Sequence, residues 1–243
     1  MANIQEVFER KETKYVITPM QYEQLLKFLR GHIEKDIYYE GTNCSVYYDT
    51  PTFELVSHSL EKPIFKQKFR IRSYGVPRLN DYIFLEIKKK FKGVNNKRRI
   101  RLKLEDFYKF IRSGELIADN PIIEREVAYW FNFYNLRPSI YIAYKRFSYC
   151  SVEDPNFRLT FDFDLRSRLD HLRLEAGDYG QSYFGRGEII MEAKTIGSFP
   201  PWFISTLSQL CIYPTSFQKY GYTYQKRFPE IANKLKKEKI INV

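Results

Sequence analysis

Basic residues occupy every second position of the stretch 65–74, whose sequence is FKQKFRIRSY: Lys66, Lys68, Arg70 and Arg72. In a β-strand, alternate side chains leave the same face, so the pattern predicts one face with four cations and an opposite face that is mainly apolar. Same-face neighbours lie roughly 7 Å apart, which gives about 0.6 kcal/mol of repulsion per pair in bulk water and ~2.4 kcal/mol at an effective dielectric of 20. Four cations on one face therefore cost little free energy in solvent, but in an enclosed space they need an anion opposite them.

The composition also indicates an anionic partner. The 243 residues carry a formal net charge of +11, which fits nucleic acid, a membrane surface or a phosphorylated small molecule. Aromatic residues make up 17% of the chain, with 20 Tyr and 20 Phe, and they favour strands.

Several functional classes lack their sequence signatures. The three cysteines form no CxxC pair and the three histidines are scattered, so no zinc site is expected. The glycine motifs GxxxxGK[ST] and GxGxxG are missing, and so is the GxSxG serine motif. Any bound anion must therefore be held by side chains.

Targeting signals are missing as well. The segment 1–14 is charged and does not fit a signal peptide, and no apolar run approaches the ~20 residues that a membrane helix needs. We expect a cytoplasmic protein without a transmembrane segment.

Period-two alternation predicts eight strands, at 5–16, 44–50, 64–74, 81–91, 96–102, 139–149, 157–164 and 187–195. Helical patterns follow Thr18-Pro19 through about residue 30 and recur near 52–60, 104–113, 121–135, 200–211 and 217–238. The glycine-rich segment 165–186 is expected to be a loop. With no linker, residues 1–243 are predicted to form a single α+β domain, a closed antiparallel eight-stranded barrel that leaves no sheet edge exposed.

Charged side chains alternate with apolar ones on most of these strands. An antiparallel sheet with one solvated face is the commonest reason for such alternation. The amphipathic helices, however, need an apolar surface to cover. If they pack outside the barrel, the charged faces line its lumen: Arg10, Glu12 and Lys14; Glu86, Lys88 and Lys90; Lys97, Arg99 and Arg101; Arg158, Asp162 and Asp164; Glu188, Glu192 and Lys194.

Carboxylates on the cationic faces argue against a nucleic-acid surface, and no nucleic-acid partner is expected. The carboxylates that would repel a polyanion unless each held a metal are Glu12, Glu86, Asp162, Asp164 and Glu192. The mixture suits phosphate groups bound together with a divalent cation.

Nine segments, in order along the chain, resemble the VTC domain, the polyphosphate polymerase domain among the triphosphate tunnel metalloenzymes. They are FERKETKYVIT (8–18), VYYDTP (46–51), FRIRSYG (69–75), FLEIKKK (84–90), NKRRIRL (96–102), AYKRFSY (143–149), FRLTFDFDL (157–165), IIMEAKT (189–195) and PTSFQKYGY (214–222). The resemblance implies a tunnel that binds ATP or another triphosphate, polyphosphate and pyrophosphate with Mn²⁺ or Mg²⁺. It also implies transfer of the terminal phosphoryl group of ATP to a polyphosphate chain, and a possible separate membrane partner.

The resemblance also implies roles for individual residues. The expected catalytic residues are Arg70, Arg72, Lys88, Arg146 and Arg158. The expected metal ligands are Glu192, Glu12 and Asp162. The expected phosphate-binding residues are Arg10, Lys14, Lys66, Lys68, Lys97, Arg99, Tyr144, Ser216 and Lys219.

Two positions depart from the patterns of related proteins. Arg10 stands where the hydrolytic branch has the first glutamate of Glu-x-Glu-x-Lys, as is usual for VTC domains, which disfavours a pure triphosphatase. Ser216 stands where polymerase-type members tend to have the first of two lysines, so a phosphate contact is lost.

Structural roles remain open for several of these residues. Asp162 or Asp164 could pair with Arg166 or Arg168, Tyr144 could be a wall aromatic, and Lys90, Lys92 and Arg101 could form a solvated rim. Three functions stay open: a metal-dependent polyphosphate polymerase, a triphosphatase or polyphosphatase of the same fold, and a non-catalytic polyphosphate-binding module.

Overall fold

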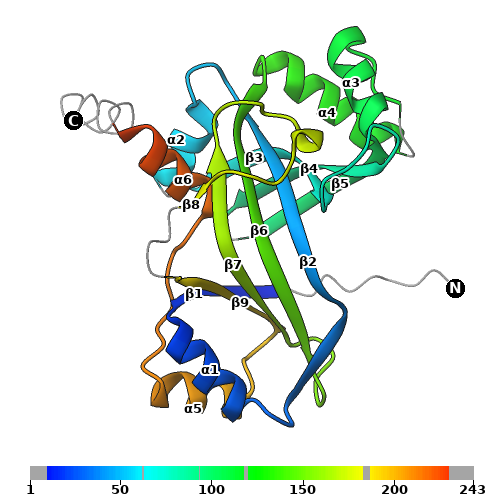
Figure 1. Ribbon diagram of the computed structural model, residues 1–243. Helices are drawn as coiled ribbons and strands as arrows, with labels where there is room; N and C mark the ends of the chain where they lie inside the picture. The colour runs from blue at the N-terminus through cyan, green and yellow to red at the C-terminus, as the bar shows by residue number, and fades with distance from the viewer. Residues whose placement is uncertain (1–9, 62, 93, 118–119, 183–186, 230–243) are drawn as a thin grey trace, which may run out of the picture. The chain divides into compact units, whose positions relative to one another are not determined.

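The computed structural model describes residues 10–61, 63–92, 94–117, 120–182 and 187–229 (Figure 1). Its strands are β1 Arg10–Ile17, β2 Ile33–Asp49, β3 Phe65–Tyr74, β4 Tyr82–Phe91, β5 Val94–Lys103, β6 Arg137–Ser151, β7 Arg158–Arg168, β8 Gln181–Ser182 and β9 Ile189–Ile196. Its α-helices are α1 Pro19–Phe28, α2 Glu54–Leu60, α3 Leu104–Ser113, α4 Pro121–Phe133, α5 Pro201–Gln209 and α6 Lys219–Arg227. Within the described ranges, no helix combines the length and hydropathy of a membrane span.

Each predicted strand and helix has a counterpart, which confirms the α+β class. Two segments were predicted wrongly. The strand predicted at 44–50 begins much earlier, because residues 33–43, which lack a clean alternation, form the first part of β2. The segment 165–186, predicted as a loop, contains the end of β7, a 3₁₀ turn at Leu174–Ala176 and β8. The predicted strand residues 5–9 and helix residues 230–238 lie outside the described residues.

The prediction of a closed barrel is wrong. Antiparallel pairing runs in the order β1-β9-β7-β6-β2-β3-β4-β5, and among the described residues no pairing joins β1 to β5. The prediction assumed that closure protects the sheet edges, but the two edges are protected locally. The N–H of Thr215 donates to the Lys14 carbonyl on β1 at 2.7 Å. β5 carries five cations, which discourage further strand pairing: Lys97, Arg98, Arg99, Arg101 and Lys103.

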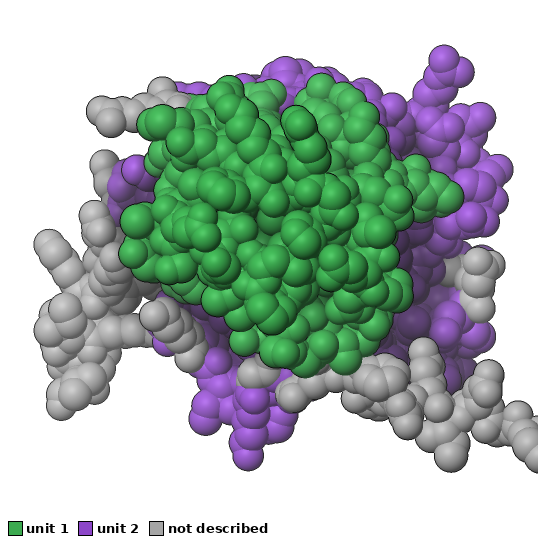
Figure 2. Space-filling model, turned by 90° about the horizontal axis from the view of Figure 1, so that it is seen from below, with its two compact units in different colours: residues 1–41, 145–164, 184–217 green, residues 42–144, 165–183, 218–243 purple. Residues whose placement is uncertain are grey.

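The chain forms two compact units, shown in green and purple in Figure 2. Unit 1 comprises residues 1–41, 145–164 and 184–217, and unit 2 comprises residues 42–144, 165–183 and 218–243. Strands β2, β6 and β7 contribute residues to both units. The single domain over 1–243 stays a prediction.

Unit 1 packs its helices on the apolar face of β1, β9 and β7. Tyr15 and Ile17 alternate with Glu12 and Lys14 on β1, and the two apolar residues join a buried cluster with α1 and α5, which lie side by side (Figure 1). The α1 helix begins as the sequence predicts. Thr18 accepts from the Gln21 N–H at 3.1 Å, and the Gln21 side chain accepts from the Thr18 N–H at 3.0 Å, which completes a capping box.

Unit 2 has its own core, in which α3 and α4 cover the apolar face of β3, β4 and β5. Phe69, Leu85 and Ile100 from the strands meet Phe107 of α3 and Phe131 of α4.

Helix α6 packs on the other face of unit 2, so the expectation that every helix covers an apolar strand face is wrong. Tyr220 of α6 stacks on Tyr47 of β2 with ring centroids 4.4 Å apart, and it donates to the buried Asp49 carboxylate at 2.6 Å. Asp49 also accepts from the N–H groups of Leu55 and Val56 at the start of α2. One buried carboxylate thus ties α2 and α6 together.

We expect Phe107→Ala to lower the free energy of unfolding by about 3–5 kcal/mol, because its fully buried ring contacts Tyr48, Phe110 and Phe131. Urea titration followed by circular dichroism measures the loss. Phe133→Ala on α4 is the matched control, since its side chain is 63% exposed, and it should cost less than about 1 kcal/mol. Equal losses in the two variants would contradict the position of the core.

Candidate functional site

One row of side chains crosses four strands on the face of unit 2 opposite its core. The register places Tyr47 of β2 beside Arg70 of β3, Arg70 beside Glu86 of β4, and Glu86 beside Arg99 of β5. Directly opposed residues on neighbouring strands point to the same face, so the four side chains meet. Arg70 Nη1 donates to the Tyr47 hydroxyl at 3.1 Å, and Arg99 Nη2 donates to the Tyr74 hydroxyl at 3.1 Å.

Glu86 lies at the centre of this row and is 1% exposed. Its Oε2 accepts from Arg70 Nε and Nη2, both at 2.6 Å. Its Oε1 accepts from Arg99 Nε at 2.8 Å and Nη2 at 2.7 Å, and from Lys97 Nζ at 2.6 Å. We call Glu86 and its three cations, Arg70, Lys97 and Arg99, the arginine cluster. One buried carboxylate here accepts from three positively charged side chains.

The cations of this face shift the pKa values of Glu86 and of Tyr47. Burial alone would raise the pKa of Glu86, but the charges of Arg70, Arg72 and Lys97 hold it well below its usual range. Burial would likewise raise the pKa of the Tyr47 hydroxyl, yet Arg70 and Arg72 lower it. The strong positive potential that remains around Glu86 favours any further negative charge.

Arg72 is a buried cation of β3 whose described hydrogen bonds go to neutral groups. Its side chain is 6% exposed, and it donates to the Ser45 hydroxyl at 3.2 Å and the Tyr144 hydroxyl at 3.0 Å. Lys219 at the start of α6 places its Nζ 4.7 Å from the centre of the Tyr144 ring. Hydroxyls solvate a guanidinium without cancelling its charge, so Arg72 suits an incoming anion.

Three further predicted lysines belong to the same face. Lys68 lies opposite Lys88, Lys88 lies opposite Lys97, and Lys66 lies opposite Lys90. Lys68 donates to the Gln218 side chain just before α6, and Gln218 also accepts from Ser59 at 3.3 Å. The predicted shared face is therefore confirmed, and we call it the basic face: Lys66, Lys68, Arg70, Arg72, Lys88, Lys97 and Arg99.

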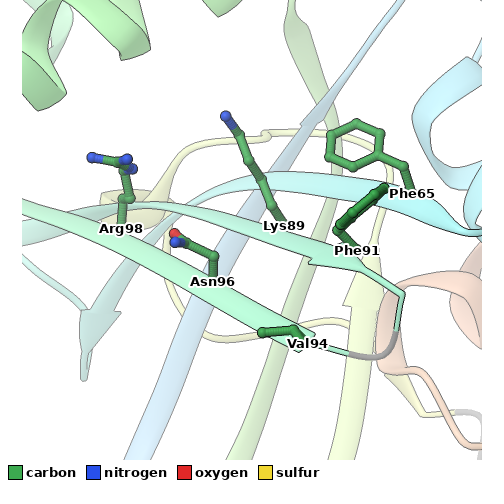
Figure 3. A pocket seen from close by; sticks show the side chains of 6 residues that line it. All are labelled: Phe65, Lys89, Phe91, Val94, Asn96 and Arg98. Atoms are coloured by element: carbon green, nitrogen blue, oxygen red, sulfur yellow. The ribbon is translucent and has the colours of Figure 1, made fainter. Parts of the chain in front are cut away.

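A pocket of about 360 Å³ in unit 2 lies on the opposite face (Figure 3). Phe65, Lys89 and Phe91 line it from β3 and β4, and these residues alternate with the cations Lys66 and Lys90. Its lysine and its arginine, Lys89 and Arg98, pair with Glu126 of α4 at 2.5 Å and 2.9 Å. The pocket is separate from the basic face.

Unit 1 carries a second charged group, which we call the carboxylate cluster: Lys14, Arg146, Asp162 and Glu192. Arg146 grips Asp162 with Nε at 2.5 Å and Nη2 at 2.7 Å, and its Nη2 also donates to Glu192 at 3.3 Å. Lys14 Nζ lies 3.9 Å from Glu192 and 3.5 Å from Glu12. Asp162 thus pairs with Arg146 of β6, while Arg166 binds Asp178 and Arg168 donates to a set of loop carbonyls.

The predicted metal ligands fit a divalent cation only in part. In the described ranges, no three His, Cys, Asp or Glu residues converge as an all-protein metal site. Both oxygens of Asp162 accept from Arg146, which makes Asp162 a poor ligand. Glu192 and Glu12 offer hard carboxylate oxygens, and Mg²⁺ is commonly held by one or two carboxylates together with substrate phosphates. The donor set therefore fits a metal that shares its coordination with phosphate.

Two predicted site residues lie apart from both clusters, and the side chain of a third is not described. Arg158 is opposite Lys194 on the charged face of unit 1, but it pairs with Asp36 of β2. Ser216 is exposed in the segment between α5 and α6. Arg10 is the first residue of β1, and its side chain lies outside the described part of the structure.

Sequence reasoning placed Glu86 on the charged face but gave it no role, and it missed Tyr47 and Gln218. Glu86 could have been singled out, because it is the carboxylate that shares a face of its strand with Lys88 and Lys90. Tyr47 gave no comparable signal, since the next residue, Tyr48, faces the core.

Comparison with known proteins identifies relatives of the chain. A profile of the VTC domain matches residues 9–228. The vacuolar transporter chaperone complex subunit 4 of Trypanosoma cruzi is 27% identical in an alignment that covers 73% of this chain. The match spans only 26% of that relative's length.

Solved structures share the fold at low sequence identity. A candidate adenylate cyclase from Bacillus halodurans superimposes with a TM-score of 0.52 at 13% identity, covering 88% of this chain and 94% of the other. A second candidate adenylate cyclase, from Vibrio parahaemolyticus, gives a TM-score of 0.50 at 12% identity, covering 89% and 98%. At such identities the likeness concerns the fold alone.

We expect Glu86→Gln to lower the free energy of unfolding by about 2 kcal/mol at neutral pH, because three cations lose their shared carboxylate, although Lys97 and Arg99 are partly screened by solvent. The folded-state pKa of Glu86 is depressed, so its contribution is present above the ordinary value of 4.5 and is lost as the pH falls through the folded-state pKa. The gap between wild type and variant should therefore close on acidification. Urea titrations from neutral pH to about pH 2 measure it, and a constant gap would contradict the ionised cluster.

Proposed function

Because the chain belongs to the VTC domain family, we propose that it is an ATP-dependent polyphosphate polymerase. It would bind triphosphate and polyphosphate through its basic face and transfer the terminal phosphoryl group of ATP to the end of a polyphosphate chain. The observation that carries the proposal is Arg72, a buried guanidinium held by the hydroxyls of Ser45 and Tyr144 beside the arginine cluster. The two hydroxyls orient the guanidinium and leave its charge to be matched by a ligand.

Charge and geometry favour phosphate as that ligand. A triphosphate carries about four negative charges near neutral pH, and a guanidinium grips two phosphate oxygens at once. Arg70 and Arg72 leave β3 on the same face, two residues apart, so they can hold successive phosphate groups. Lys68, Lys88 and Lys219 add point charges on or beside that face.

The proposed metal site lies in the carboxylate cluster of unit 1. Glu192, with Glu12, would hold Mn²⁺ or Mg²⁺; Lys14 lies beside both carboxylates and Arg146 pairs with Glu192. When bound, such a cation neutralises charge on phosphate oxygens during transfer.

The chemical step needs alignment more than covalent help. An oxygen of the terminal phosphate of the acceptor chain forms a bond to the γ-phosphorus of ATP, and the bond from that phosphorus to the bridging oxygen breaks, releasing ADP. The roles of Arg70 and Arg72 are to orient the reacting phosphates and to stabilise the charge that grows on the equatorial and leaving oxygens. Water as acceptor would give a triphosphatase instead. Arg10, in the place of the first glutamate of the hydrolytic pattern, favours the polymerase.

The relative from Trypanosoma cruzi is named as a subunit of a vacuolar transporter chaperone complex. We include in the proposal a separate membrane partner that takes up the chain as it grows. The match covers 26% of that relative's length, so the membrane partner is part of the proposal and not of the comparison.

We expect Arg72→Ala to weaken polyphosphate binding 10- to 100-fold, as losing a charge-assisted contact worth about 1.5–3 kcal/mol would do. Glu192→Ala should abolish chain synthesis and largely spare binding. The assay incubates purified protein with ATP and Mn²⁺ and resolves polyphosphate by length on a gel. Lys109→Ala is the control, because Lys109 pairs with Asp106 on the surface of α3 away from the basic face.

The same gel separates the proposal from its alternatives. A ladder that is lost in Glu192→Ala supports the polymerase. Steady release of phosphate without a ladder would instead assign a triphosphatase. Tight retention of polyphosphate with neither product would assign a binding module.

A further inference from the structure

The arginine cluster already contains an anion, and its position restricts how a ligand can enter. One oxygen of Glu86 accepts from Nε and Nη2 of Arg70. The other oxygen accepts from Nε and Nη2 of Arg99 and from Nζ of Lys97. The same edge of each guanidinium therefore faces the carboxylate. The remaining donors of Arg70 are turned toward Tyr47, and Nη1 of Arg99 takes part in none of these bonds.

This arrangement fixes the rotation of both guanidinium planes. A flexible arginine could present any edge to a phosphate, whereas Arg70 is held at both ends, by Glu86 and by the Tyr47 hydroxyl. Tyr47 is itself held by stacking on Tyr220, which donates to Asp49. Pre-organised donors lose little freedom when the ligand binds and need no rearrangement during transfer.

From this geometry we infer that Glu86 is a positioning residue that makes the site selective for phosphate chains over single phosphate ions. The inference rests on the proposed function, since the ligand is taken to be phosphate. A compact ion seeking contact with all three cations must displace a buried, ionised carboxylate. An extended chain can lie along the outer donors of Arg70, Arg72 and Lys68, which leave β3 on one face, without displacing it.

The exposed fractions of the side chains agree with this distinction between the cations that contact Glu86 and the cations left to the phosphate chain. The Arg99 and Lys97 side chains are 33% and 45% exposed, Arg70 is 21% exposed, and Arg72 is buried. Glu86 thus offsets charge at the more solvated end of its row, while the buried guanidinium of Arg72 keeps neutral partners. Removing the Glu86 carboxylate would make the face more positive but would leave the guanidinium groups of Arg70 and Arg99 less fixed in orientation.

The test measures binding and transfer separately in Glu86→Gln. Binding of tripolyphosphate and of orthophosphate is measured by calorimetry over a range of salt concentrations, and chain extension by the ladder assay. We expect tripolyphosphate to bind as tightly or more tightly, with a salt slope steeper by about one unit because the site gains one positive charge. The preference for tripolyphosphate over orthophosphate should fall about tenfold, and kcat for extension should fall at least tenfold.

Glu126→Gln is the matched control. Glu126 also pairs with one lysine and one arginine from β4 and β5, Lys89 and Arg98, but on the opposite face. It should leave affinity, salt slope and preference within about twofold of wild type. Loss of binding and rate in parallel in Glu86→Gln, or no change in either, would overturn the inference.

Glu86→Asp keeps the test decisive if the glutamine variant fails to fold. It retains the negative charge but withdraws the carboxylate by one methylene group, so one carboxylate can no longer reach both arginines. We expect an unchanged salt slope, a lower kcat and a reduced preference for tripolyphosphate. A variant with wild-type rate and preference would show that only the charge of Glu86 matters, which overturns the inference.

If wild type makes no polyphosphate, the polymerase proposal fails, but the two binding measurements still test Glu86. A preference for tripolyphosphate that survives in Glu86→Gln would overturn the inference even when wild type makes a ladder.

Discussion

Repulsion between like charges is the constraint on which the basic face of this protein depends. Cations at alternate positions of β3 continue across β4 and β5, so each has like-charged neighbours both along its strand and beside it. In a partly enclosed environment such repulsion costs several kcal/mol in total unless it is offset. Glu86 offsets it for Arg70, Lys97 and Arg99, and hydroxyls solvate Arg72. The cations therefore stay charged and fixed in orientation on a face that a negatively charged ligand can bind.

Alternation along the strands lets the same residues build a core and a charged face. In unit 2, Phe69, Leu85 and Ile100 pack under α3 and α4 on one face, while Arg70, Glu86 and Arg99 occupy the other. In unit 1, Tyr15 and Met191 are buried, while Lys14 and Glu192 are neighbours on the opposite face. A one-residue shift in register would place charges in the core, so the cores hold the site in position.

The sequence was sufficient for whatever depends on local periodicity. The strand at 65–74, the helix after Thr18 and the shared face of Lys68, Arg70 and Lys88 all follow from spacing. Closure could not be predicted in this way, because it depends on how each edge is protected. Thr215 protects β1 through a single backbone hydrogen bond, and local patterns carry no trace of that long-range contact. Helix α6 was predicted as a helix, but its place against Tyr47 depends on Tyr220 and Asp49, which are far apart in the sequence.

The role of Glu86 shows why a site is harder to predict than a face. Alternation put Glu86 among cations, but a carboxylate in that position could hold a metal, pair with one arginine or serve several cations. The distances select the last of these, because each oxygen of Glu86 lies within 2.8 Å of two or more nitrogen atoms. An oxygen already shared among guanidinium and ammonium groups has little capacity for a metal. The carboxylates proposed to hold a metal are Glu192 and Glu12 of unit 1, which leaves Glu86 to order the cations of unit 2.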